Sequence, residues 1–203
     1  LMAGHVTVKQ QPVTKAGTLV DVESDMAVKE QLRYVGRGGQ KMAGALNDFG
    51  IDPTGMVVLD VGASTGGFTD CLIQRGATRS YALDVGKGQI HNKLIQDPRV
   101  VVLERVNARY PFPLDDVVDL ATVDVSFISL TRVLHSAAAH IKEGGPIVAL
   151  VKPQFEARRN EVGRGGVIRD PKVHARVLGR VIAWVINNGF RFRGLVPSPI
   201  TGE

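Results

Sequence analysis

The sequence predicts an α/β fold in which helices cover both faces of a doubly wound, mainly parallel sheet. Five runs rich in β-branched residues alternate with stretches of helical periodicity, an order typical of parallel strands joined by helices. The runs are nearly continuous in apolar character, as strands covered on both faces are. With 203 residues, 44% of them hydrophobic, the chain can form one core of ordinary size and a small appendage.

The elements follow in a regular order along the chain. Residues 1–24 hold two short alternating pieces, at 6–8 and 18–22, and are expected to be the C-terminal remnant of a small module whose front is missing. A linker is expected at 25–38 and the α/β domain at 39–203. The predicted strands of that domain are MVVLDV at 56–61, SYALDV at 80–85, VVVLERV at 100–106, LATVDV at 120–125 and IVALV at 147–151.

Two helices have recognisable ends. One is predicted from an apolar stripe that ends at Gly144 and consists of Leu130, Val133, Leu134, Ala137 and Ile141. The other has Asp170 as its N-cap and Pro171 as its first residue, and it ends at Gly189. Its apolar positions are Val173, Val177, Val181 and Val185.

The first strand leads into a glycine-rich loop, LDVGASTGGFTD at 59–70. Its spacing departs from the dinucleotide fingerprint G-x-G-x-x-G, because Ser64 stands where the middle glycine belongs. An acid before the loop, Asp60, suits the cationic amino group of S-adenosylmethionine better than a pyrophosphate. An ordinary strand-to-helix turn is the alternative.

The next two strands also end in polar residues. Asp84 lies 24 positions after Asp60, about where an acid accepts hydrogen bonds from ribose hydroxyls. Asn107 either reads an adenine edge or forms a plain turn. The predicted cofactor contacts are Asp60, Gly62, Ala63, Ser64, Gly66, Gly67, Phe68, Asp84 and Asn107.

Charged residues end the last two strands, in a crevice where ligands of such sheets bind. Asp124 follows the fourth strand, and Ser129 is the better candidate to cap the helix after it. Lys152 ends the fifth strand beside Asp124; a structural ion pair is the alternative, although buried pairs stabilise weakly. Lys41 begins the helix before the first strand, where a cation opposes the helix dipole.

Four segments together resemble the TlyA family of ribosomal RNA methyltransferases, within the FtsJ-like group: GRGGQK, LDVGASTGGFTD, DVSFISL and LVKPQFE. The resemblance implies a Rossmann-like methyltransferase domain with S-adenosylmethionine as methyl donor. It also implies that the acceptor is the 2′-hydroxyl of cytidine in ribosomal RNA within ribosomal subunits, and that residues 1–24 belong to an RNA-binding module.

The family's Lys-Asp-Lys-Glu tetrad corresponds to Lys41, Asp124 and Lys152, with Glu203 as the candidate for the fourth place. The family has a longer SP…G…GN-x-E segment where this chain reads SPITGE, so either residues before Glu203 are missing or Glu203 is not equivalent. Family members continue with an antiparallel edge strand, which the domain at 39–203 is expected to lack.

A ribose hydroxyl is a poor nucleophile, so a base or a positive field must assist loss of its proton. We expect Lys152 to be the base, Asp124 to orient it and Lys41 to position the hydroxyl or a phosphate, although which lysine is neutral stays open. Methylation of cytosine C5 requires a nucleophilic cysteine, and Cys71 is expected in the core. Methylation of exocyclic amines is usually marked by an Asp/Asn-Pro-Pro-aromatic stretch, where this chain has DVSF.

The net charge of +5 favours a polyanionic partner. The residues predicted to contact RNA are Arg158, Arg159, Arg164 and Arg169 in the loop after Lys152, with Arg33 and Arg37 before Lys41. A solvated charged loop is the alternative.

A lone cysteine allows neither an internal disulfide nor a paired-cysteine metal site, so we expect no metal and a cytoplasmic location. The sequence has no apolar run of about 20 residues and no signal peptide, which predicts no membrane partner. The name haemolysin, which members of the family also carry, raises membrane lysis as the alternative function. No secretion signal or long amphipathic cationic helix supports it.

Overall fold

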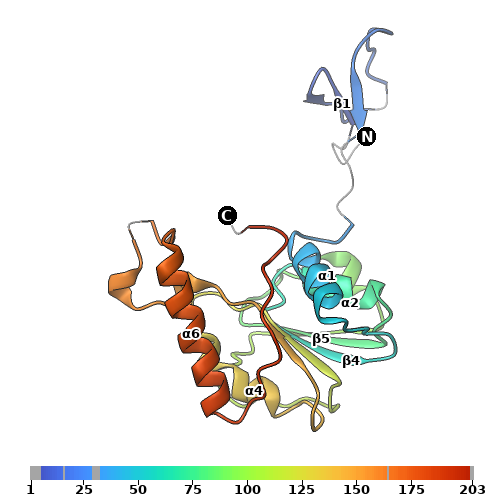
Figure 1. The fold of residues 1–203 in the computed structure, drawn as a ribbon. Helices are drawn as coiled ribbons and strands as arrows, with labels where there is room; N and C mark the ends of the chain where they lie inside the picture. Colours follow the sequence, from blue (N-terminus) through green and yellow to red (C-terminus); the bar gives the residue numbers. More distant parts are fainter. Residues whose placement is uncertain (1–5, 16, 29–32, 164, 202–203) are drawn as a thin grey trace. The chain divides into compact units, whose positions relative to one another are not determined.

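The structure is a computed structural model that describes residues 6–15, 17–28, 33–163 and 165–201. The chain forms two compact units, residues 1–33 and 34–203 (Figure 1). The first unit holds an antiparallel sheet in the order β2-β1-β3, formed by β1 (Val6–Val8), β2 (Gln11–Pro12) and β3 (Met26–Val28).

Two details of the first unit differ from the sequence-based expectation. The strand predicted at 18–22 does not form: Leu19 is 99% and Val22 92% exposed, because so small a sheet offers no core to bury them. Instead β3 pairs with β1 from within 25–38, the range predicted as a linker. The alternating piece predicted at 6–8, by contrast, does form a strand, β1.

The second unit is built on a five-stranded sheet in which every pairing is parallel, as predicted. Its strands are β4 (Val57–Val61), β5 (Arg79–Asp84), β6 (Val100–Glu104), β7 (Leu120–Val123) and β8 (Ile147–Ala149). The spatial order is β6-β5-β4-β7-β8. After β4 the chain adds β5 and β6 on one side and then returns to add β7 and β8 on the other, so the switch point lies between β4 and β7. A Rossmann-like sheet of this order binds ligands at the carboxyl ends of the two strands that flank the switch point.

Helices cover both faces of this sheet (Figure 1). One face packs against α1 (Gly38–Phe49), α2 (Gly67–Gln74) and α3 (Asn92–Ile95). The other packs against η1 (Leu130–Arg132), α4 (Leu134–Ala138) and α6 (Pro171–Asn187). Alternation along the strands explains the two cores, since Val58 lies with the first helices and Leu59 with the second. A buried leucine such as Leu59 contributes about 1.5–3 kcal/mol.

The predicted helix caps are present. The Asp170 side chain accepts a hydrogen bond from the Lys172 N–H at the start of α6, and Ser129 caps η1 through the Thr131 N–H. The helix predicted from Leu130 is divided into η1 and α4, because Val133 leaves helical geometry at φ −120°. In the described part of the chain, no helix is long and apolar enough to cross a membrane.

Candidate active site

A cavity of about 190 Å³ lies at the carboxyl ends of β4, β7 and β8, at the switch point of the sheet. Its walls come from α1, the loop between β4 and α2, the start of α2, the segment after β7, and Lys152 between β8 and α5. The cavity therefore joins stretches that are far apart in the sequence. The lining residues are Gly38, Lys41, Gly62, Ala63, Ser64, Thr65, Gly67, Phe68, Asp124, Ser126 and Lys152.

The glycine loop passes close to the backbone of the neighbouring strand. Gly62 has a φ of 86°, and a Cβ at this position would lie 2.7 Å from the carbonyl oxygen of Asp124. Only glycine combines this conformation with so close an approach. Gly66, with a φ of 92°, faces Leu94 instead, where a Cβ would lie 2.2 Å from Leu94 Cδ1, so its part is structural.

Asp60 does not line the cavity, although its place near the end of the strand predicted contact with a cofactor. Its fully buried Oδ2 accepts hydrogen bonds from the Thr69 N–H (3.0 Å) and hydroxyl (2.7 Å), and Oδ1 accepts one from the Thr122 hydroxyl at 2.9 Å. Burial raises the pKa of Asp60 to about 6, with a smaller contribution from Asp124, while the hydrogen bonds oppose this shift. The carboxylate thus anchors the start of α2 beneath the loop.

Asp84, the last residue of β5, and Asn107, in the loop after β6, do not line the cavity. Asp84 accepts hydrogen bonds from the Ser64 N–H at 2.8 Å and the Gly86 N–H at 2.7 Å, one on each oxygen. It therefore shapes the glycine loop, in which Ser64 has a φ of 49°. Asn107 is exposed, and its Oδ1 accepts a hydrogen bond from the Arg109 N–H. This is the geometry of a plain turn, the alternative to reading an adenine edge.

Lys152 and Asp124 face each other across the ends of β8 and β7. Lys152 Nζ lies 2.7 Å from Asp124 Oδ1 and donates a hydrogen bond of 2.8 Å to Ser126 Oγ. The contact with Asp124 is an ion pair without hydrogen-bond geometry, so this oxygen keeps an unused acceptor position. Both side chains are largely buried, at 20% and 18% exposure, and water screens the pair less than it would screen a surface pair.

Lys41 reaches the same cavity from α1. This helix packs closely against α2, as shown by Gly67, where a Cβ would lie only 2.9 Å from the Gly39 backbone nitrogen. Among the described residues Lys41 has neither an ion-pair nor a hydrogen-bond partner. The cavity therefore holds one paired cation and one whose ammonium is available to a ligand.

Two neighbours of Asp124 had no assigned role in the sequence. Ser126 lines the cavity and binds Lys152, a contact that only the path of the loop could reveal. Phe127 is 91% exposed with a φ of 63° and packs its ring 5.1 Å from that of Phe155. An exposed aromatic residue in a strained conformation beside a cavity is a signal for function.

The predicted RNA-binding arginines take different places. Arg158, Arg159 and Arg169 are exposed in the segment after Lys152, and Arg37 donates to the Thr201 carbonyl at 2.9 Å. Arg33 is exposed at the end of the first unit. Arg164 and Glu203 lie outside the described residues, so the fourth place of the tetrad stays a prediction.

Glu161 fixes the arginine-rich loop to α6. Arg180 donates to both of its carboxylate oxygens, at 3.1 and 2.6 Å, and the Arg158 N–H donates at 2.8 Å. These bonds, led by that from Arg180, lower the pKa of Glu161 to about 2. The base of the loop is anchored while the side chains of Arg158 and Arg159 remain exposed.

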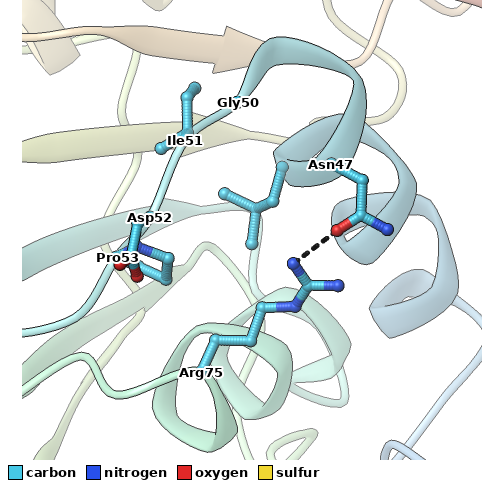
Figure 2. A pocket seen from close by; sticks show the side chains of 7 residues that line it. Asn47, Gly50, Ile51, Asp52, Pro53 and Arg75 are labelled. Atoms are coloured by element: carbon cyan, nitrogen blue, oxygen red, sulfur yellow. Dashed lines mark hydrogen bonds between the residues drawn. The ribbon is translucent and has the colours of Figure 1, made fainter.

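A larger, open cavity of about 430 Å³ lies at the opposite ends of the strands, between the end of α1, the turn that follows it and Arg75 (Figure 2). Arg75 donates to Asn47 Oδ1 at 2.7 Å there. It contains none of the predicted site residues, and functional sites of such sheets lie at the carboxyl ends. We therefore assign the site to the smaller cavity.

Two further expectations concern metals and cysteine. Within the described ranges, no three His, Cys, Asp or Glu side chains gather as metal ligands would. Cys71 is fully buried in α2 with Phe68 and Leu72, as predicted for a core residue.

The chain is similar to known methyltransferases over nearly its whole length. The FtsJ-like methyltransferase family model matches residues 34–203. A proposed rRNA methyltransferase of Bacillus subtilis, YqxC, is 48% identical, with all of this chain and 73% of that protein covered. The 16S/23S rRNA (cytidine-2′-O)-methyltransferase TlyA of Mycobacterium tuberculosis is 43% identical over 98% of this chain and 76% of that protein.

A solved structure agrees with these relatives. A proposed hemolysin from Streptococcus thermophilus superposes with a TM-score of 0.82 at 44% identity, over 99% of this chain and 75% of that one. The resemblance to TlyA proteins in the sequence is thereby confirmed. The chain belongs to the FtsJ-like methyltransferase family.

Proposed function

We propose that this protein transfers a methyl group from S-adenosylmethionine to the ribose 2′-hydroxyl of a cytidine in ribosomal RNA. The single observation that carries the proposal is the convergence of Lys41, Asp124 and Lys152 on the cavity that the glycine loop also lines. The Mycobacterium tuberculosis relative is named as an rRNA (cytidine-2′-O)-methyltransferase, and this name supports cytidine in ribosomal RNA as the substrate.

The loop fits the proposed cofactor. A Cβ on Gly62 or Gly67 would collide with the backbone of Asp124 or Gly39, so these glycines let the loop pack against β7 and α1 and form one wall of the cavity. Asp84 stands beside the loop with each oxygen holding one backbone N–H, which leaves acceptor positions for ribose hydroxyls. When bound, S-adenosylmethionine supplies a methyl group attached to a positively charged sulfur.

The charged residues then act on the hydroxyl. Lys152 acts in its neutral form, after its ammonium has released a proton to solvent. The amine, placed by Asp124 and Ser126, then takes the hydroxyl proton as the oxygen forms its bond to the methyl carbon and the carbon–sulfur bond breaks. Asp124 orients the amine. Lys41, without a partner among the described residues, binds the hydroxyl or an adjacent phosphate and stabilises developing negative charge.

The substrate is bound through its backbone. Arg158, Arg159 and Arg169 are exposed on the segment that follows Lys152, so phosphates of RNA that enters the cavity can reach them. The same proposal includes RNA contacts by Arg33, Arg37 and Arg164. It also includes a location in the cytoplasm and a reaction without a metal.

The test uses methyl-labelled S-adenosylmethionine and isolated ribosomal subunits. The expected product carries label on the 2′-oxygen of a cytidine, located by nuclease digestion and mass spectrometry. Label on a base, or no transfer to either subunit, contradicts the proposal. Membrane lysis is tested separately by dye release from liposomes incubated with the protein alone, where no release is expected.

A further inference from the structure

The segment after Lys152 is joined to the segment after Asp124 at three successive points. At the first, Lys152 contacts Asp124 and Ser126. At the second, the rings of Phe155 and Phe127 lie 5.1 Å apart. The third is Glu156, the last residue of α5 (Pro153–Glu156), which reaches back to the cap of η1.

Glu156 uses both carboxylate oxygens in this last contact. Oε2 accepts the Ser129 hydroxyl at 2.6 Å, and Oε1 accepts the Leu130 N–H at 2.7 Å. Hydrogen bonds to a charged acceptor are the stronger kind. Leu130 is only 2% exposed and belongs to the core under η1, so the far side of the contact is a fixed point of the fold.

On the near side, α5 is otherwise held by the contact of Phe155 with Phe127 and by packing against α6. The helix α5 is four residues long and contains no buried residue, and so short a helix is not stable by itself. Lys152 immediately precedes this helix as its N-cap residue. The position of the amine therefore depends on what fixes α5.

We propose that Glu156 is a positioning residue that holds Lys152 in register with Asp124 and Ser126. It acts through α5, by fixing the end of that helix to the core at Leu130. This inference rests on the proposed function, because it assigns Glu156 to the reaction at Lys152. A shift of about 1 Å in a reacting group can slow a reaction by about 10²-fold, which is the scale of effect expected.

The experiment compares Glu156→Ala and Glu156→Gln with Glu143→Gln, an exposed control in the turn before β8. Single-turnover methylation of ribosomal subunits is expected to slow by about 10- to 100-fold in Glu156→Ala, with unchanged calorimetric affinity for S-adenosylmethionine. Glu156→Gln keeps an acceptor for one of the two donors and should recover part of the rate. The control should match the wild-type protein.

A second readout does not depend on the reaction. Lys152 Nζ is held by two partners, so acetic anhydride should modify it slowly in the wild-type protein and faster in Glu156→Ala, as measured by mass spectrometry. If the wild-type protein methylates no RNA but Lys152 is still modified faster in Glu156→Ala, the proposed function is wrong and the positioning role of Glu156 is supported.

The outcome that overturns the inference is a Glu156→Ala protein with wild-type rate and wild-type Lys152 modification. If that variant does not fold, Ser129→Ala decides the question, because it leaves the Leu130 bond to Glu156 in place and removes the Ser129 bond together with the cap of η1. An intermediate rate and faster Lys152 modification are expected for it, and wild-type values for both overturn the inference.

Discussion

Lys152 Nζ and Asp124 Oδ1 lie 2.7 Å apart at the ends of the neighbouring strands β8 and β7. Because the strands are parallel, both residues leave the sheet at the same edge, where Gly62 also passes within contact of Asp124. The pair therefore connects the loop proposed for the cofactor with the arginine-rich segment proposed for RNA.

Asp84 is predicted to affect cofactor binding. In Asp84→Asn, one of the two backbone N–H groups loses its acceptor, and the ribose loses a charged acceptor. Affinity for S-adenosylmethionine, measured by calorimetry, should fall by about 1–3 kcal/mol. Asp116→Asn is a matched control, because Asp116 binds Arg79 and Tyr81 away from the cavity. Equal losses in the two variants would contradict a specific role for Asp84.

Asp60 is predicted to affect stability and its pH dependence. Its folded-state pKa of about 6 exceeds the unfolded value of 3.8, so its contribution is fully present below pH 3.8 and is lost as the pH rises through 6. The difference corresponds to about 3 kcal/mol in the free energy of unfolding. Asp60→Asn should remove this dependence.

The measurement for Asp60 is urea denaturation of both proteins at pH 4 and pH 7. From pH 4 to pH 7, the free energy of unfolding should fall more in the wild-type protein than in Asp60→Asn. Glu161, whose pKa is lowered, acts in the opposite direction, but it is common to both proteins and cancels in the comparison. An identical pH dependence in the two proteins would show that the Asp60 carboxyl titrates normally.

Local patterns explain why much of this fold follows from the sequence. The five strands and the Asp170–Pro171 start of α6 depend on residues within a few positions of one another, and all were predicted. The carboxyl ends of parallel strands share one edge, which also placed Lys152 beside Asp124. The sequence therefore predicted both the sheet and the central pair of the site.

The missed features depend on contacts that sequence position does not encode. Being near the end of a strand does not tell which way a side chain points, and Asp60 turns toward Thr69 and Thr122. The contacts of Ser126 with Lys152 and of Glu156 with Ser129 join loops 26 and 27 residues apart. Such pairings appear only once the paths of both loops are known.

Arg158 and Arg159 are predicted to bind RNA phosphates. Their exposed side chains should each release about one counterion, so replacing both with glutamine should reduce the salt dependence of RNA affinity by about two in log–log slope. Replacing the exposed Arg191 and Arg193 in the same way is the control. Filter binding of ribosomal RNA over a salt series gives both slopes, and equal slopes in the two variants would rule out the loop as the RNA contact.

The most direct test of the account is the single-turnover rate of methyl transfer when Lys152 is replaced by methionine or by arginine. Methionine keeps most of the aliphatic volume without the amine, and the rate should fall by about 10²- to 10⁴-fold while the cofactor still binds. Arginine keeps the charge but cannot lose its proton, so it should fail nearly as badly if Lys152 takes the proton. Partial recovery with arginine would make Lys152 an electrostatic residue, and a wild-type rate with methionine would contradict any part for it in the reaction.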